Sequence, residues 1–303
     1  MEKRVIAKGD RLDKEITDKN LSRSQAAKLI VSGGVSVGGK KEYKPSYKTT
    51  VGEIIKVLIP KEQPKEILPV DIPLNVIYED EYLAIIEKPA GLICHPSDST
   101  SEMTLVNALL ARFSKLSDIA GEDRRGIVHR LDKETSGIML IAKDNKSHIL
   151  LSNMFKKRQV DKRYIAFVQG GFSELSGTIN APIARSLRDR KKMAVVEGGR
   201  EAITNWRVIK EYGVKTALEV QIITGRTHQI RVHMAHIHHP VLGDDVYGYK
   251  KAPKANRLML HAWYLSFEHP IYKKQLKYTC KPDDGFLVPE SFYDGYIERF
   301  INN

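Results

Sequence analysis

Residues 126–137 read GIVHRLDKETSG and run directly into the apolar segment IMLIA at 138–142. The second segment has the length and the aliphatic composition of a buried strand. The first is therefore a loop ahead of that strand, and it carries Asp132 between Arg130 and Lys133. An isolated aspartate in a loop is by default a turn residue or an ion-pair partner. The residues around it decide whether it is more than that.

The chain around this loop predicts one long mixed body of strands and helices. Strands are expected over 83–86, 137–142, 164–168 and 218–222, and helices over 104–113 and 145–155, where the apolar spacing is near 3.6 residues. Prolines at 60, 64, 69 and 73 alternate with charged residues and exclude a regular helix there. We therefore expect a Pro-rich linker over 61–74 and a large domain over 75–303.

The charge of the chain is concentrated before that linker. The 303 residues carry a net charge of 49 − 37 = +12, and residues 1–60 hold 13 − 7 = +6 of it. This positive charge predicts an anionic binding partner, and it favours nucleic acid over a membrane surface. Two cysteines exclude a disulfide scaffold, and no apolar run is long enough for a membrane span. The first residues are polar and lack the apolar region of a signal peptide, so we expect a cytoplasmic protein.

Residues 1–60 have the pattern of a small basic domain. Ser22 and Gln25 form a capping-box pattern ahead of an amphipathic helix, and Gly33-Gly34 ends it. Val35 and Val37 then alternate as in a short strand, and a closing strand is expected over 54–59. Segments 11–13, 21–24, 28–30, 34–40 and 44–47 resemble the small RNA-binding domain of a ribosomal protein, the alpha-L motif.

That resemblance implies that Arg23, Lys28 and Lys40 face folded RNA. The alternative is a solvated charged surface without a partner. The sequence of residues 34–41 also nearly matches the motif of a phosphate-binding loop. We reject this match because Lys41 replaces the Ser or Thr whose hydroxyl would bind magnesium, and because Pro45 excludes the helix that should follow the loop.

Two other chemistries are disfavoured by the residues themselves. The histidines at 228, 233, 236, 238 and 239 lack the spacing and carboxylates of a zinc site, so no metal is expected. Asp132 and Glu134 are two residues apart and cannot face each other across a sugar as an acid–base pair.

Residues 129–137 match the HRLDxxTSG signature of the RluA/RluD-type pseudouridine synthases, and the resemblance covers almost all of the chain after the linker. Segments 87–96, 162–166, 224–233 and 239–248 resemble further motifs of that family. The resemblance implies an α+β fold: a catalytic domain with a mixed, largely antiparallel central sheet, and a small N-terminal alpha-L RNA-binding domain. It also implies isomerisation of uridine to pseudouridine in RNA without a cofactor.

The family match assigns the catalytic roles to Asp132, Tyr164 and Arg231. Asp132 would act as nucleophile or base, and burial would raise its pKa unless a cation held it ionised. Arg231 would be that cation, pointing inward from a strand on which Ile230 and Val232 alternate with it. Tyr164 would stack on the flipped uracil, and its hydroxyl would assist proton transfer at C5.

The expected RNA contacts near the site are Arg130, His129, Lys88 and Ile230. The target uridine must leave its stack to reach Asp132, and Arg130 would fill the vacated space or hold a phosphate. We thus expect a monomer that modifies structured RNA, with large-subunit ribosomal RNA or a pre-ribosomal particle as substrate and transfer RNA as the alternative. Other interpretations are a non-catalytic RNA-binding ribosome-assembly factor and a metal-dependent nuclease.

Overall fold

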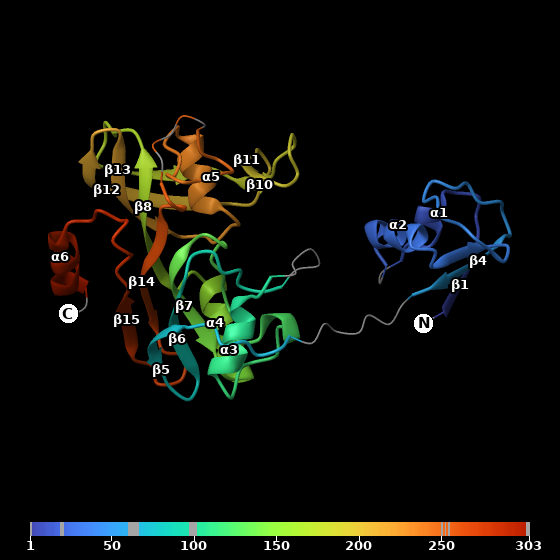
Figure 1. The fold of residues 1–303 in the computed structure, drawn as a ribbon, viewed down its shortest axis with the longest axis horizontal. Helices are drawn as coiled ribbons and strands as arrows, with labels where there is room; N and C mark the ends of the chain where they lie inside the picture. Colours follow the sequence, from blue (N-terminus) through green and yellow to red (C-terminus); the bar gives the residue numbers. More distant parts are fainter. Residues whose placement is uncertain are drawn as a thin grey trace. The chain divides into compact units, whose positions relative to one another are not determined.

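The computed structural model describes residues 2–18, 21–59, 67–96, 102–249, 251, 253 and 255–300. It divides the chain into two compact units, residues 1–66 and 67–303 (Figure 1). Each unit has its own cluster of buried apolar side chains.

The small unit is a four-stranded antiparallel sheet with two helices. Its spatial order is β1-β4-β2-β3. The elements are β1 (Glu2–Ile6), α1 (Leu12–Glu15), α2 (Arg23–Val31), β2 (Val35–Val37), β3 (Lys40–Lys41) and β4 (Ile54–Leu58). The predicted capping box is confirmed: Ser22 Oγ accepts from the Gln25 N–H at 3.4 Å, and Gln25 Oε1 accepts from the Ser22 N–H at 2.9 Å. The capped helix buries one apolar face on the sheet.

The large unit is built on a nine-stranded sheet with the order β5-β6-β7-β14-β8-β13-β12-β9, and β15 pairs with β14. Only β7 and β14 pair in parallel among these strands as described. The predicted α+β class with a mixed, largely antiparallel sheet is confirmed. The strands are β5 (Asn75–Glu79), β6 (Leu83–Lys88), β7 (Ser136–Ala142), β8 (Asp161–Gln169), β9 (Ser176–Asn180), β12 (Ile203–Tyr212), β13 (Lys215–Ile222), β14 (Leu260–Glu268) and β15 (Gln275–Thr279).

The remaining elements surround this sheet. Strands β10 (Ile183–Arg185) and β11 (Met193–Val195) form a separate hairpin. The helices are α3 (Leu105–Arg112), α4 (Asn145–Lys156), α5 (Gln229–His236) and α6 (Glu290–Phe300), with a 3₁₀ turn at Glu122–Arg124. In Figure 1, α3 and α4 lie beside the half of the sheet that holds β6 and β7, and α5 lies beside the β10–β11 hairpin. None of the helices in the described ranges is long and apolar enough to cross a bilayer.

Strands β6 and β7 are buried on both faces. Along β7, Met139 and Ile141 belong to one apolar cluster, while Ile138 and Leu140 belong to another on the opposite face. A strand covered on both faces needs no polar positions, which explains the uninterrupted run at 138–142. The strand that follows the Asp132 loop is therefore anchored in the middle of the core.

Gly137 makes the parallel contact between β7 and β14 possible. Its φ is +116°, and a Cβ at this position would lie 2.1 Å from the carbonyl oxygen of Ala262. No other residue type fits so close an approach of two backbones. Because Gly137 is five residues after Asp132, this contact fixes the base of the Asp132 loop.

The strand expected around Arg231 is not present. The segment around Arg231 is helix α5, not a strand, and its three successive residues Ile230, Arg231 and Val232 are all buried. Because this short helix is buried on several sides, its sequence lacks the separate apolar and polar faces by which an amphipathic helix is recognised. The first part of the predicted linker over 61–74, residues 61–66, lies outside the described residues. The second half of this linker packs on the large unit, where the Val70 N–H donates to Asn107 O at 3.0 Å.

Candidate active site

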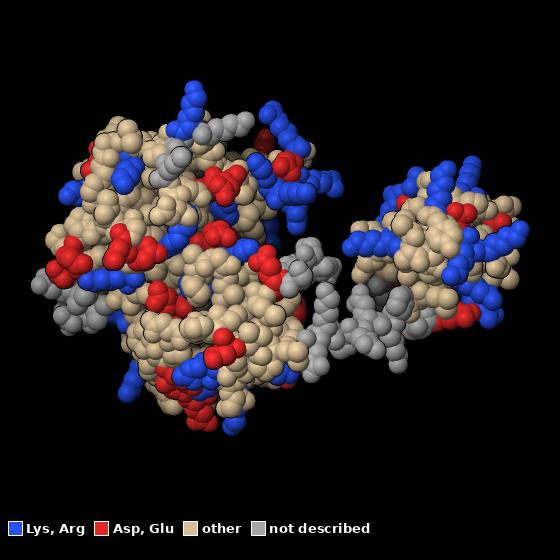
Figure 2. All heavy atoms as spheres, in the orientation of Figure 1, with Lys and Arg blue, Asp and Glu red and all other residues tan. Residues whose placement is uncertain are grey.

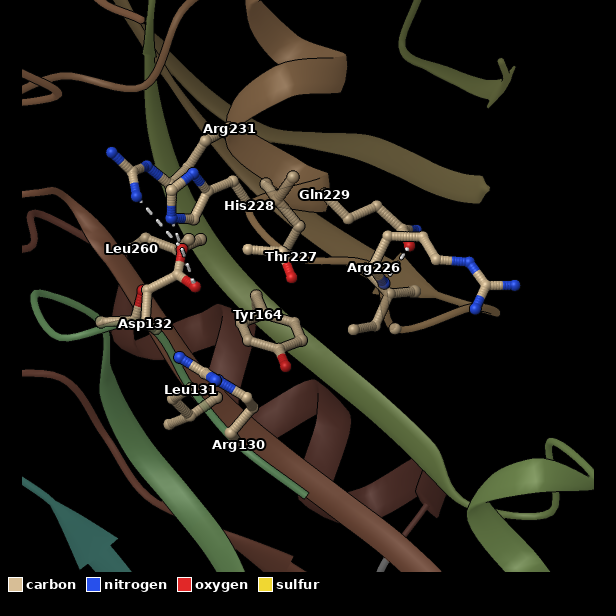
Figure 3. Close-up of a pocket in the computed structure, with 14 residues that line it drawn as sticks. Arg130, Leu131, Asp132, Tyr164, Arg226, Thr227, His228, Gln229, Arg231 and Leu260 are labelled. Carbon is tan, nitrogen blue, oxygen red and sulfur yellow. Dashed lines mark hydrogen bonds and ion pairs between the residues drawn. The ribbon is translucent and has the colours of Figure 1, made fainter. Parts of the chain in front are cut away.

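A pocket opens in the large unit, where the loop before β7, strands β8 and β14, and the start of α5 meet (Figure 3). It brings together five of the predicted site residues: Arg130, Asp132, Tyr164, Ile230 and Arg231. The other lining residues are Leu131, Thr135, Ile222, Gly225, Arg226, Thr227, His228, Gln229 and Leu260. Segments more than 90 residues apart in the chain thus share one cavity.

Asp132 forms an ion pair with a buried arginine. Arg231 Nη1 donates to Asp132 Oδ2 at 3.2 Å, and Arg231 Nε and Nη2 donate to the two carboxylate oxygens of Asp244 at 2.7 and 2.8 Å. The Asp244 side chain is fully buried and also accepts from the backbone N–H groups of Val246 and Tyr247. The two parallel bonds to Asp244 therefore fix the guanidinium, and Nη1 is directed at Asp132.

Arg231 and Asp244 each stabilise the charged form of the other. Burial alone would raise the pKa of Asp244, but the hydrogen bonds and charge of Arg231 outweigh it and hold that pKa below its usual value. Burial likewise opposes the charge of Arg231, and the bonds to Asp244 and the charge of Asp132 raise its pKa instead. Asp244 lies within the segment 239–248 that resembles a family motif, but nothing in the sequence indicates that it binds Arg231.

His228 is a second site residue that the sequence analysis did not single out. It precedes α5 in the left-handed backbone conformation, with φ at +56°, and its Nε2 lies 4.0 Å from Asp132 Oδ1. Its Nδ1 is 2.8 Å from the Tyr247 hydroxyl, which accepts from the Met193 N–H at 2.9 Å. Burial lowers the pKa of His228. Its position three residues before Arg231 was the available signal.

Tyr164 presents its ring to the pocket from strand β8 (Figure 3). The residue is 6% exposed, and burial, followed by the charge of Asp132, raises the pKa of its hydroxyl. A phenol with a raised pKa stays protonated at neutral pH and acts as a hydrogen-bond donor. Ile230 and Leu260 add apolar surface to the same cavity.

Arg130 lies at the rim of the pocket. It is exposed, and its Nη1 is 3.4 Å from Nε2 of His95. Figure 3 shows Asp132 between Arg130 and Arg231, so an arginine stands on each side of the carboxylate.

Lys88 and His129, both expected to contact RNA, do not line the pocket. Lys88 is fully buried and donates to the carbonyls of Pro89, Leu92 and Lys133 at 2.6, 2.9 and 3.0 Å. Burial lowers its pKa to about 8. Its ammonium has no access to a ligand, and it ties the loop that carries Asp132 to the end of β6.

The side chain of His129 makes its contacts within the protein. Its Nε2 accepts from the Leu140 N–H at 2.9 Å, and its ring stacks on Phe155 with a centroid distance of 4.6 Å. Burial lowers its pKa to about 3, so the ring stays neutral and acts as an acceptor. The side chain packs against α4 and does not line the pocket, and its contact with RNA stays a prediction.

Arg23, Lys28 and Lys40 belong to the small unit and are exposed there. Arg23 forms an ion pair with the buried Asp13 at 3.1 Å, so part of its charge is already compensated. Figure 2 shows Lys and Arg side chains around the visible face of this unit, with fewer acidic ones between them.

The histidine cluster does not form a metal centre in the part of the chain that the structure describes, where no three His, Cys, Asp or Glu side chains converge. His233 uses both ring nitrogens, with Thr204 Oγ1 at 2.8 Å and Ala181 O at 2.9 Å. His239 Nδ1 is 2.8 Å from the carbonyl of Gln169.

The comparison with known families agrees with the geometry of the pocket. The sequence profile described as RNA pseudouridylate synthase matches residues 82–236, which include Asp132, Tyr164 and Arg231. The chain belongs to this family. The profile of the S4 domain matches residues 10–55, within the small unit of this pseudouridine synthase. The enzyme is therefore an isomerase that converts uridine to pseudouridine in RNA, with an RNA-binding S4 domain.

Relatives at full length support the assignment. An RNA pseudouridine synthase of Aquifex aeolicus is 45% identical over 298 residues, covering 94% of each chain. A ribosomal large subunit pseudouridine synthase D of Zymomonas mobilis is 42% identical over 295 residues, covering 92% of this chain and 93% of the relative. Among solved structures, human RNA pseudouridylate synthase domain containing 1 is similar with a TM-score of 0.58 and 26% identity, over 70% of this chain and 84% of that one.

Proposed function

We propose that this pseudouridine synthase modifies large-subunit ribosomal RNA. The support is the name of relatives such as those of Zymomonas mobilis and Escherichia coli, which are ribosomal large subunit pseudouridine synthases D at 42% and 38% identity. A separate basic RNA-binding unit joined to the catalytic unit suits a long, structured RNA, because two linked contacts raise the effective affinity. Transfer RNA is the alternative that the assay below must test.

In the proposed mechanism Asp132 acts on the target nucleotide as nucleophile or base. The N1–C1′ bond breaks, the uracil turns, and a new C5–C1′ bond forms while C5 loses a proton and N1 gains one. The reaction is an isomerisation, so the balance of atoms calls for no cofactor. The single observation that carries the proposal is the ion pair between Asp132 and Arg231 in the pocket, in which the buried Asp244 holds the Arg231 guanidinium in place.

The remaining pocket residues would hold the base. The target uridine must leave its stack, which costs a few kcal/mol and is offset by new contacts. We propose that Tyr164 stacks on the uracil with Ile230 and Leu260 as apolar walls, and that Arg130 fills the space left in the RNA or binds a phosphate.

The direct test uses purified protein with unmodified large-subunit ribosomal RNA, followed by carbodiimide mapping of pseudouridine. We expect modification at discrete uridines, and none with Asp132→Asn. Asp284→Asn, an exposed carboxylate, is the matched control and should leave the map unchanged. Transfer RNA is assayed in parallel, and modification of transfer RNA alone would overturn the proposed substrate. Full activity of Asp132→Asn would overturn the assignment of Asp132.

We further propose that the enzyme acts as a monomer in the cytoplasm. Light scattering of the purified chain should give a mass near 34.3 kDa, and fractionated cells should hold the protein away from membranes. A mass that is a multiple of this value would contradict the monomer.

A further inference from the structure

We propose that Asp132 and His228 together bind the ribose 2′-hydroxyl of the target uridine. The proposal rests on the proposed function of the pocket and adds His228 to the residues that contact the reacting nucleotide. His228 Nε2 and Asp132 Oδ1 face each other across 4.0 Å, beyond direct hydrogen-bond distance. Their side chains are 24% and 19% exposed, so the gap between them is open to the pocket (Figure 3).

The imidazole of His228 is fixed in its orientation. Its Nδ1 is held by the Tyr247 hydroxyl at 2.8 Å, and that hydroxyl is itself held by the backbone N–H of Met193 at 2.9 Å. The backbone at His228 is left-handed, with φ at +56°. For a residue other than glycine such a conformation costs free energy, and functional sites are where proteins retain it. The ring therefore points at Asp132 because of both its backbone and its hydrogen-bond partner.

The same contacts decide which ring nitrogen carries the proton. The Tyr247 oxygen accepts from Met193, and we assign its own proton to the bond with His228 Nδ1. Burial lowers the pKa of His228, so the ring is neutral near pH 7 and has a single N–H. This network assigns that N–H to Nε2, which makes Nε2 a donor on one side of the gap.

The other side of the gap is an acceptor. Asp132 Oδ2 is bonded to Arg231, whereas Oδ1 is the oxygen that faces His228. A group seated between them must accept from an N–H and donate to a carboxylate at once, and a hydroxyl does both. A hydroxyl about 2.8 Å from each atom spans the gap.

In a uridine inside an RNA chain, only the 2′-hydroxyl has this property. The 3′ and 5′ oxygens are phosphate esters, the uracil carbonyls only accept, and N3–H only donates. The 2′-hydroxyl also distinguishes RNA from DNA. His228 and Asp132 would therefore select ribose over deoxyribose and also position the sugar. Binding the 2′-hydroxyl would hold the neighbouring C1′, where the bonds change, beside the Asp132 carboxylate.

The test is a double-mutant cycle between the protein and the RNA. Two oligonucleotides are identical except for uridine or 2′-deoxyuridine at the mapped target. Each is given to wild-type protein, His228→Asn and His228→Gln, and both kcat/KM for pseudouridine formation and Kd are measured. Asn tolerates the left-handed backbone but is too short to span the gap, while Gln keeps an N–H donor of greater reach.

On the uridine RNA, we expect His228→Asn to lower kcat/KM or affinity by about tenfold, the scale of one hydrogen bond. On the 2′-deoxyuridine RNA the same substitution should cost almost nothing, and His228→Gln should recover activity only on the uridine RNA. Equal losses on both RNAs would overturn the proposal. Should the deoxy substrate not react with any protein, the Kd cycle decides. Absence of pseudouridine with wild-type protein on uridine RNA is the separate failure of the proposed function.

Discussion

At the scale of single residues, a basic enzyme has to keep one carboxylate charged where a polyanion binds. Asp132 has one guanidinium in direct contact, and that guanidinium is itself bound by a fully buried carboxylate, Asp244. Asp132, Arg231 and Asp244 form a row of alternating charges, and the cations Arg130 and Arg226 also line the pocket. The position of the Asp132 carboxylate therefore depends on Asp244, which does not line the pocket.

We expect Asp244→Asn to reduce kcat about 100-fold, because the Arg231 fork loses its carboxylate and shifts relative to Asp132. The free energy of unfolding should fall by about 3 kcal/mol, since a buried cation loses its charged partner. Single-turnover assays and urea unfolding measure the two effects. Asp245→Asn is the control, because the neighbouring aspartate is exposed. Unchanged kcat in Asp244→Asn would contradict the positioning role.

Lys88 predicts a pH dependence of stability. Its pKa falls from 10.5 to about 8 on folding because the ammonium is buried. Between these values the unfolded chain binds a proton that the folded chain does not, so the contribution of Lys88 to the free energy of unfolding rises with pH, by at most about 1.4 kcal/mol per unit. Below the folded pKa both states are protonated and the contribution is constant.

The measurement is urea unfolding of wild-type protein and Lys88→Met from pH 7 to pH 10. The difference in unfolding free energy, wild type minus variant, should be flat below pH 8 and rise above it. Subtraction removes the groups that both proteins share. A difference that falls with pH would show that the folded state raises the pKa of Lys88.

At the scale of elements, the pocket is formed where strands β7 and β14 run in parallel inside an otherwise antiparallel sheet. The parallel contact brings the loop before β7 next to β8 and the start of α5. It depends on Gly137, whose missing side chain lets the two backbones meet. Sequence alternation could not show this, because a close backbone approach leaves no mark except the glycine itself.

Gly137→Ala should destabilise the fold by at least about 3 kcal/mol, from strain at φ +116° and from a Cβ placed 2.1 Å from Ala262 O. Gly91→Ala is the matched control, with φ at +83° and nothing within 4 Å of the added Cβ, and should cost only about 1 kcal/mol. Thermal unfolding followed by circular dichroism compares the two. Equal losses would mean that the clash with β14 is relieved by a backbone shift.

At the scale of the whole molecule, two units with separate cores divide the work. The catalytic pocket lies entirely in the large unit, and the exposed lysines of the small unit are far from it in sequence. Contacts to phosphate add affinity without information about the base, so the small unit should affect binding more than the chemical step.

We expect the double variant Lys28→Gln, Lys40→Gln to raise KM and leave kcat unchanged at saturating RNA. The dependence of log Kd on log salt should weaken by about 0.7–0.9 for each lysine that no longer binds a phosphate. Lys8→Gln with Lys56→Gln removes the same charge from other exposed positions of this unit and serves as the control. If both double variants change the salt dependence equally, only the net charge matters.

The sequence by itself determined the two-part organisation, the class of ligand and the identity of Asp132, Tyr164 and Arg231 as residues to examine. These follow from local patterns: charge concentrated in residues 1–60, a capping box, and a dense motif around Asp132. The structure brings those three residues into one pocket, and their catalytic roles stay predictions until the assays above are done.

What only the tertiary structure decided is how each side chain is used. Lys88, His129 and Asp244 all belong to segments that the motifs cover, and only the fold shows that two of them support the loop and the third holds Arg231. Arg231 lies on helix α5 and is bonded to Asp132, a residue far away in the sequence. His228 meets Asp132 only through space. Contacts between distant segments depend on packing, and packing has no signature in the local sequence.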